Sequence, residues 1–176
     1  LHEPLSGDRM KSREIFGVTL FYFFLTLIFF HQIFLGFTPF PGDLLVSRYQ
    51  PWRSVSYLGY VSGSYPTKDQ YFDVIRQIYP WKTESLSQIK NWQIPLWNPY
   101  NFSGSPLLAN FQSAIFYPLN FFYFLTSQIN AWTILVMCQP LLAGIFTYFF
   151  ASQIGLSKRG SLFSGVVFSY SLFIAV

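Results

Sequence analysis

The sequence predicts an all-α polytopic membrane protein, and three observations support this fold class. Of the 176 residues, 52% are hydrophobic and only 10% are charged, whereas about a quarter of the residues in a soluble domain are charged. Phenylalanine alone occurs 22 times. Two runs without Asp, Glu, Lys or Arg, at 15–38 and 129–152, reach the roughly 20 apolar residues that a membrane-spanning helix needs.

The first run, 15–38, is predicted to be an uncleaved transmembrane helix. Its core reads IFGVTLFYFFLTLIFFHQIFLGF and follows a short segment at 1–14. A cleaved signal peptide is the alternative, but its apolar region is shorter, about 7–15 residues, and ends in a small-residue cleavage site. The sequence Pro39, Phe40, Pro41 provides no such site.

Two further spans are expected. Residues 129–152 form the second span, where Pro140 is tolerated because neighbouring helices satisfy the carbonyl group that proline leaves free. The third begins at Ser161 and is interrupted at 176. Because the sequence starts at Leu1 and stops inside an apolar run, we expect it to be the N-terminal piece of a longer protein.

The basic residues predict how the spans are oriented. The clusters are Arg9, Lys11 and Arg13 before the first span, and Lys158 and Arg159 after the second. The positive-inside rule places both clusters in the cytoplasm. Segments 1–14 and 153–160 are therefore expected to be cytoplasmic, and the long loop 39–128 extracytoplasmic.

The segment 94–125 is apolar, yet it is predicted not to cross the membrane. It has no charged residue, but it is interrupted by Pro95, Pro99, Pro106, Pro118, Asn98, Asn101, Asn110 and Asn120. Irregular backbone at membrane depth is tolerated only where protein buries it or where it lines a water-filled cavity. We therefore expect a cavity wall at the outer surface. The alternative is a proline-kinked spanning helix, which would place Lys158 outside.

Two short interfacial helices are predicted in the loop, at 67–79 and 83–91. In the first, Thr67 and Gln70 form a capping-box pair. Its apolar and polar residues fall on opposite faces, as in a helix that lies in the membrane interface. Pro80 is expected to end this helix at the preceding residue.

Three aspartates of the loop are candidates for acid–base chemistry or cation binding. Asp43 follows a Pro-Gly turn just beyond the first span, where a carboxylate can accept a proton from a hydroxyl group; an Asx turn or a helix N-cap is the alternative. Asp69 and Asp73 share one helical face, so they either raise each other's pKa or bind a cation. The alternative there is a solvated face with an Asp73–Arg76 pair.

Basic and aromatic side chains of the loop are candidates for substrate binding. Guanidinium groups match phosphate oxygens in a bidentate way, although contact with lipid headgroups explains them equally well. Tryptophan stacks on a sugar ring or anchors the loop in the membrane interface. The candidates are Arg48, Arg53, Arg76, Trp81 and Trp97, with Trp52 and Trp92 beside them.

Several other classes of function have little support. The net charge of +4 comes from dispersed basic residues, so no nucleic-acid partner is expected. His2 and His31 are isolated, and Cys138 is the only cysteine. No zinc, phosphate-loop or dinucleotide motif occurs, which leaves soluble nucleotide chemistry without a site.

The string DVIRQIYPWKTESLSQIKNWQIPLWNPYNFSGSPLLANFQSAIFYPLNFFYFL at 73–125, with PGDLL at 41–45, resembles the YfhO-like bacterial membrane proteins. The resemblance covers about 41–175 and includes SGVVFSYS in the third span. It is specific, because many Pro, Trp, Asn and Gly positions coincide. This family is counted among the GT-C type glycosyltransferases, multi-spanning enzymes that use polyprenyl-phosphate sugars.

The resemblance implies an enzyme of the bacterial cytoplasmic membrane that works on its outer face. A sugar would pass from a polyprenyl-phosphate donor to a cell-envelope glycan, lipid or protein in one inverting displacement. Asp43 and Asp73 match the acidic positions, one of which would be the general base for the acceptor hydroxyl. A divalent cation or basic side chains would help the lipid phosphate to leave, and no other cofactor is implied.

A lipid-linked donor needs an apolar groove for its tail and a polar cavity for its sugar phosphate, and the segment 94–125 would separate the two. Asn98, Asn101, Asn110 and Gln112 would then bind sugar hydroxyls, or else cap the proline-broken backbone.

Two other functions remain alternatives. A transporter or lipid flippase carries ionisable residues near the middle of its spans, whereas the predicted spans carry none apart from His31. A non-enzymatic membrane scaffold predicts no polar cavity beside the outer end of the first span.

Overall fold

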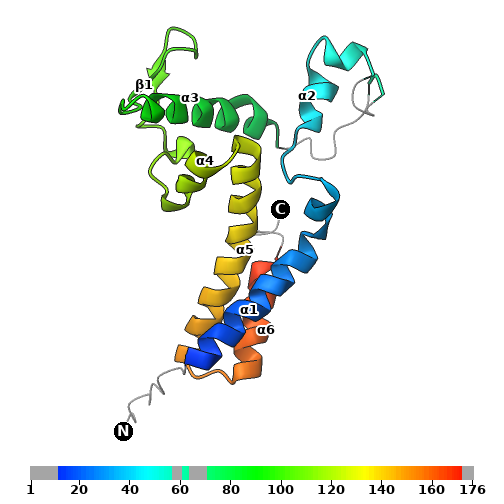
Figure 1. Cartoon of the computed structure of the whole chain (residues 1–176), viewed down its shortest axis with the longest axis vertical. Coiled ribbons are helices and arrows are strands. Elements are labelled where there is room, and N and C mark those ends of the chain that lie inside the picture. The colour runs from blue at the N-terminus through cyan, green and yellow to red at the C-terminus, as the bar shows by residue number, and fades with distance from the viewer. Residues whose placement is uncertain (1–11, 57–60, 64–70, 172–176) are drawn as a thin grey trace. The chain divides into compact units, whose positions relative to one another are not determined.

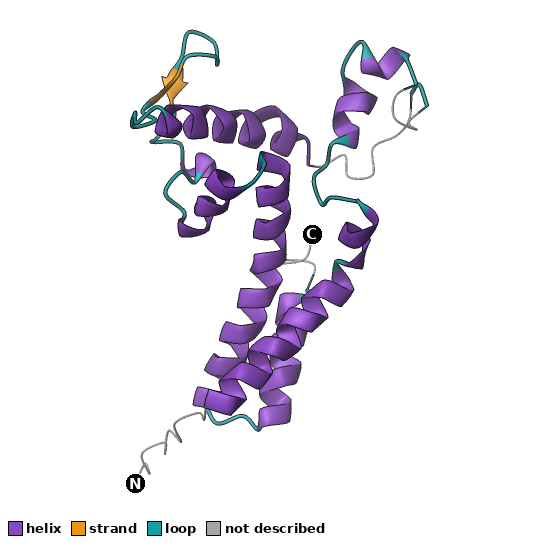
Figure 2. Ribbon diagram, viewed as in Figure 1, coloured by secondary structure: helices purple, strands orange, loops and turns teal. Residues whose placement is uncertain are grey.

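The computed structural model describes residues 12–56, 61–63 and 71–171. It is mostly helical and divides into two compact units: unit 1 comprises Leu1–Thr38 and Thr133–Val176, and unit 2 comprises Pro39–Trp132. Figure 2 shows how far helices predominate in the described residues. A small antiparallel sheet departs from the all-α prediction; its strands, β1 (Trp97–Asn98) and β2 (Ser105–Pro106), have two residues each.

Unit 1 is built from helices that correspond to the predicted spans. They are α1 (Ser12–Phe29), the short turn η1 (His31–Leu35), α5 (Gln128–Gln153, which begins in unit 2) and α6 (Lys158–Ser169). Helix α6 begins before the expected Ser161, because the Ser157 side chain accepts a hydrogen bond from the Gly160 backbone N–H (3.2 Å) and caps the first turn. Helix α5 continues through Pro140.

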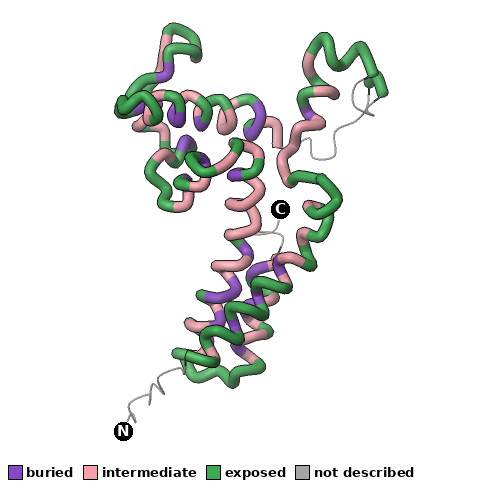
Figure 3. The backbone as a smooth tube through the Cα atoms, viewed as in Figure 1, coloured by how far each residue is buried: buried purple, intermediate pink, exposed green. Residues whose placement is uncertain are grey.

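Helices α1 and α5 are long and apolar enough to cross a membrane. Their 18 and 26 residues correspond to about 27 Å and 39 Å at 1.5 Å per residue, against a hydrocarbon core of about 30 Å. Only 17% and 22% of their most apolar windows are buried, and much of α1 is exposed in Figure 3. The core helix of a soluble protein is mostly buried, so this exposure favours a lipid-facing surface. Large exposed side chains include Phe16, Phe24, Ile28, Phe146 and Phe150.

Helices α1, α5 and α6 lie side by side in unit 1 (Figure 1). Glycines let them pack closely around Tyr22 of α1. The Tyr22 ring is fully buried, and its hydroxyl donates to the backbone carbonyl of Leu162 (2.9 Å). A Cβ atom at Gly165 would overlap the Tyr22 hydroxyl, and one at Gly144 would lie 2.5 Å from the ring. Glycine is therefore required at both positions for this packing.

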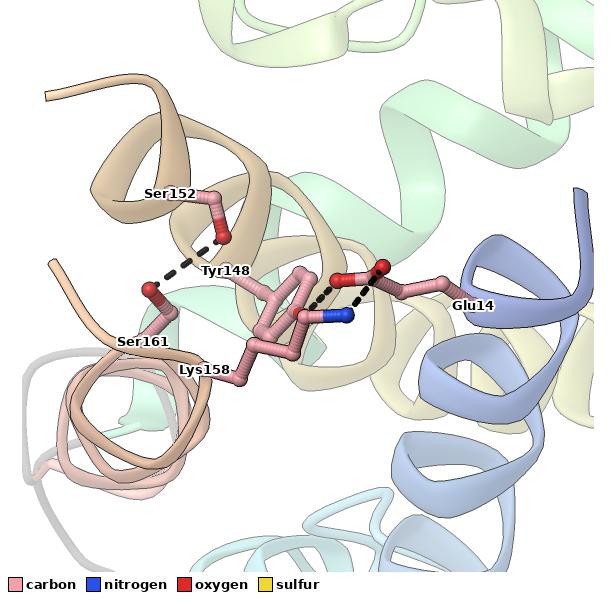
Figure 4. A network of polar contacts seen from close by, with 5 residues as sticks. All are labelled: Glu14, Tyr148, Ser152, Lys158 and Ser161. Atoms are coloured by element: carbon pink, nitrogen blue, oxygen red, sulfur yellow. Dashed lines mark hydrogen bonds and ion pairs between the residues drawn. The ribbon is translucent and has the colours of Figure 1, made fainter. Parts of the chain in front are cut away.

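A polar network joins the three helices at one end of unit 1 (Figure 4). The Glu14 carboxylate accepts hydrogen bonds from the Tyr148 hydroxyl (2.7 Å) and from the Lys158 ammonium (2.6 Å). The hydroxyl groups of Ser152 and Ser161 are 3.2 Å apart beside it. The network places the start of α1 and the α5–α6 turn at the same end, as the predicted pair of crossings requires. Which side of a membrane this end faces remains a prediction.

Unit 2 combines short helical pieces with irregular backbone. In chain order they are α2 (Asp43–Arg48), η2 (Trp52–Ser54), the π-turn η4 (Val74–Ile78), α3 (Tyr79–Lys90), strands β1 and β2, η5 (Phe111–Ser113), η6 (Pro118–Phe121) and α4 (Phe122–Leu125). The segment 94–125 thus has only short helical pieces, and its longest continuous helical run is η6 followed directly by α4, at 118–125. That irregularity agrees with its prolines and asparagines, while its place relative to a membrane remains a prediction.

The prediction that Pro80 ends a helix is wrong. Helical backbone runs without a break from Phe72 to Lys90, so the expected helices 67–79 and 83–91 are parts of one element; residues 67–70 lie outside the described residues. Before the proline the helix widens into the π-turn η4, where the Tyr79 backbone N–H bonds the Val74 carbonyl five residues back. This wider turn accommodates a residue that has no N–H of its own.

Candidate functional site

Asp43 is the first residue of α2, in unit 2. The N-cap residue of this helix is Gly42, so Asp43 is not the N-cap residue that was one alternative. The Asp43 side chain is half-buried, whereas the next residue, Leu44, is fully buried and anchors the helix. A carboxylate in the first turn of a helix is favoured by the partial positive charge of that end.

Asp73 lies on the exposed side of the helix just before η4. Its carboxylate accepts a hydrogen bond from the Gln77 side-chain amide (3.2 Å). Arg76 instead lies over the ring of Phe72, 5.7 Å from the ring centre. The alternative of a solvated helix face is thus confirmed in part: Asp73 and Arg76 are both exposed, but they do not form the expected ion pair with each other.

Two aromatic contacts bring the segments that carry these aspartates together within unit 2. Phe40 packs on Tyr79 with ring centres 5.3 Å apart. Tyr49 stacks on Phe72 at 5.9 Å with an interplanar angle of 11°. Asp43 lies between Phe40 and Tyr49 in the chain, and Asp73 lies between Phe72 and Tyr79. Residues 40–49 and 72–79 are therefore neighbouring segments that run in opposite directions.

The remaining charged candidates are more dispersed. Arg48 and Arg53 are exposed, at the end of α2 and in η2. Asp69 lies outside the described residues. Among the residues that the structure does describe, no three His, Cys, Asp or Glu side chains gather into a possible metal site. A cation held by one or two carboxylates together with a donor phosphate remains a prediction.

The two tryptophan candidates differ in exposure. Trp81 is half-buried in the first turn of α3. Trp97 is 50% exposed on β1, and its indole lies against Gly104, where a Cβ atom would overlap the ring. Gly104 has φ +104°, a backbone conformation that favours glycine. The Gly104 backbone therefore packs against the Trp97 indole, while the residue as a whole remains exposed.

The amide candidates are largely engaged in local turns. Asn98 is buried, and its side chain accepts from the Tyr100 backbone N–H (3.0 Å). Asn110 accepts from the Gln112 backbone N–H (3.1 Å) and caps η5. The side chains of Asn101 and Gln112 make no hydrogen bond to a described residue, and Gln112 is exposed. The capping alternative thus describes Asn98 and Asn110, while Gln112 is available to a ligand.

Sequence reasoning missed Lys82, a buried amine in α3 that is only 8% exposed. Its Nζ donates to the backbone carbonyl of Ser113 (2.8 Å) and lies 5.4 Å from the centre of the Tyr123 ring. Burial lowers the pKa of Lys82 from 10.5 to about 8, and burial raises the pKa of Tyr123 to about 12. Helical spacing could have indicated that Lys82 is buried, because Lys82, Ser85 and Leu86 share one buried face of α3.

No protein-family model, curated protein or solved structure matches the chain.

Proposed function

We propose that the chain is part of an integral-membrane glycosyltransferase of the GT-C type, of the kind that its resemblance to the YfhO-like proteins implies. The donor is a polyprenyl-phosphate sugar, and the acceptor is a glycan, lipid or protein of the bacterial cell envelope. Two long apolar helices and a run from 91 to 157 without a charged residue support a membrane setting.

The observation that carries the proposal is the aromatic pairing of residues 40–49 with 72–79. It holds the half-buried Asp43 and the exposed Asp73 on two neighbouring segments of one unit. A carboxylate can act as a general base that takes a proton from a hydroxyl group. Arg76, held over Phe72 on the same segment as Asp73, supplies a fixed positive charge for a phosphate.

In the proposed reaction the acceptor hydroxyl oxygen attacks the anomeric carbon of the donor. Its proton passes to the carboxylate of one of the two aspartates. The bond between the anomeric carbon and the phosphate oxygen breaks, and polyprenyl phosphate leaves with both electrons of that bond. The configuration at the anomeric carbon is inverted, and no oxidant or reductant is needed.

The test is to replace both aspartates, Asp43→Asn and Asp73→Asn, in the full-length protein within membranes. We expect sugar transfer from radiolabelled polyprenyl-phosphate sugar to fall at least about 100-fold, because general-base catalysis contributes about 10²–10⁴, while membrane insertion is unchanged. Glu84→Gln is the matched control, since Glu84 is a carboxylate of the same unit that already binds Gln88 (2.7 Å). Undiminished transfer by the double variant would refute the proposal.

A further inference from the structure

Two contacts suggest a specific role for Lys82. Its ammonium reaches the Ser113 carbonyl, 31 residues further along the chain, and at the same time lies beside the Tyr123 ring. It is thus the point where α3, the turn η5 and α4 meet. Among the described residues Lys82 has no carboxylate partner.

The loop that Lys82 holds, residues 107–120, is irregular and depends on side chains to satisfy its backbone. The buried Ser113 hydroxyl lies within hydrogen-bonding distance of the carbonyls of Leu107 (3.2 Å) and Asn110 (2.6 Å). The buried Asn120 amide donates to the carbonyls of Ala114 and Ile115. Unsatisfied buried carbonyl groups are costly, so each of these donors stabilises the loop.

Lys82 differs from the other donors because it lies outside the loop. The Ser113 and Asn120 side chains act on groups within 107–120, so they shape the loop without attaching it to α3. The Lys82 amine joins the loop to the helix. The protonated amine gains from the carbonyl dipole and from the face of the aromatic ring, and these contacts offset part of the cost of burying its charge.

We infer that Lys82 is a positioning residue: its amine, held between the Ser113 carbonyl and the Tyr123 ring, clamps the loop 107–120 onto α3 and fixes where the loop presents Gln112. The role of Gln112 in binding a donor sugar rests on the proposed function. The contact between Lys82 and the loop does not rest on the proposed function, because it is measured without any substrate. The failure of one proposal can therefore be told apart from the failure of the other.

The clamp gives the loop a dependence on pH whose sign follows from burial. In the closed loop the pKa of Lys82 is about 8, and in an opened, solvated loop it returns towards 10.5. The open form therefore binds the proton more tightly, and raising the pH favours the closed form. The facing groups do not titrate in this range, since the Ser113 partner is a carbonyl and the pKa of Tyr123 is about 12.

The experiment is pulsed hydrogen–deuterium exchange on the full chain in lipid nanodiscs at pH 7 and pH 9. In Lys82→Met, which removes the amine, we expect amides of 107–120 to exchange about 10- to 100-fold faster at pH 7. Lys90→Met is the matched control, because Lys90 is an exposed lysine of the same helix. It should change exchange by less than about twofold. Unchanged or slower loop exchange in Lys82→Met would overturn the inference.

The pH comparison separates a clamp from a general loss of stability. In the wild-type chain, protection of 107–120, corrected for intrinsic exchange, should rise about tenfold between pH 7 and pH 9. In Lys82→Arg protection should not change with pH, because a guanidinium remains charged, and it should not exceed that of the wild-type loop at pH 7, because burial disfavours the charge. If Lys82→Met destabilises the whole chain, the pH dependence of the wild-type loop and that of the Lys82→Arg loop test the inference instead. A pH-independent wild-type loop, or a pH-dependent Arg variant, would contradict the clamp.

Discussion

The two units satisfy their backbone polar groups in different ways. In unit 1 regular helices satisfy their own N–H and C=O groups, and close packing depends on Gly144 and Gly165 against Tyr22. In unit 2 the backbone is irregular, and side chains such as Lys82 and Asn120 bind the carbonyls that no helix or sheet satisfies. Unit 1 is therefore sensitive to added volume, whereas unit 2 is sensitive to lost hydrogen bonds.

The largest effect should come from adding a single methyl group to unit 1. Gly165→Ala places a Cβ atom against the Tyr22 hydroxyl and 2.8 Å from the Gly144 carbonyl oxygen. We expect a loss of about 2–3 kcal/mol in the free energy of unfolding, since overpacking typically costs about 1–3 kcal/mol and the Tyr22–Leu162 hydrogen bond is also disturbed. Denaturant unfolding in mild detergent measures it.

Gly17→Ala is the control for this substitution. No atom lies within 4 Å of the Cβ position at Gly17, and in a helix alanine is favoured over glycine by about 0.5–1 kcal/mol. Stability should therefore stay the same or rise slightly. If both alanine variants behaved alike, the close packing around Tyr22 would not be the source of stability in unit 1.

A smaller effect is expected from the polar network at the end of unit 1. Glu14→Gln removes the negative charge that binds Lys158 and weakens the acceptor for Tyr148. Because the Lys158 side chain is 75% exposed, we expect a loss of only about 1 kcal/mol. A double-mutant cycle with Lys158→Met should give a coupling energy of about 0.5 kcal/mol or more. Strict additivity would show that the ion pair does not stabilise the packing of α6 on α1.

The smallest effect should come from one cap in unit 2. Asn110→Ala removes the side-chain acceptor for the Gln112 backbone N–H at the start of η5. We expect a loss of up to about 1 kcal/mol, seen as faster amide exchange in 107–120 alone. Asn101→Ala is the matched control, because the Asn101 side chain makes no hydrogen bond to a described residue. If both variants changed amide exchange equally, the side-chain hydrogen bond of Asn110 would not be what stabilises this part of unit 2.

The regular part of the fold could be predicted from the sequence because length and lack of charge are local properties. The runs 15–38 and 129–152 correspond to α1 with η1 and to α5. The proline rule failed at Pro80, where a widened turn absorbed the missing N–H. Strands of two residues are too short to give an alternating pattern, so the sheet could not be predicted.

The candidate site was predictable only in part, because tertiary contacts decide what a polar side chain does. The spacing around Asn110 left sugar binding and capping open, and the structure shows the cap. Lys82 was missed because its partners lie 31 and 41 residues further along the chain, and no local pattern connects them. A lysine on the apolar face of a short helix is nevertheless a signal that it has a buried partner.

The contacts of unit 1 have a consequence for how the chain assembles. Three hydrogen bonds join α1 to residues much later in the chain: Tyr22 to Leu162, Thr26 to Tyr170 and Glu14 to Lys158. Their partners are 140, 144 and 144 residues apart. At a synthesis rate of about 5–20 residues per second, α1 exists for roughly 7–30 seconds before these partners emerge from the ribosome. During that interval its hydroxyl and carboxyl groups have none of these partners, so α1 is made well before the contacts that secure it can form.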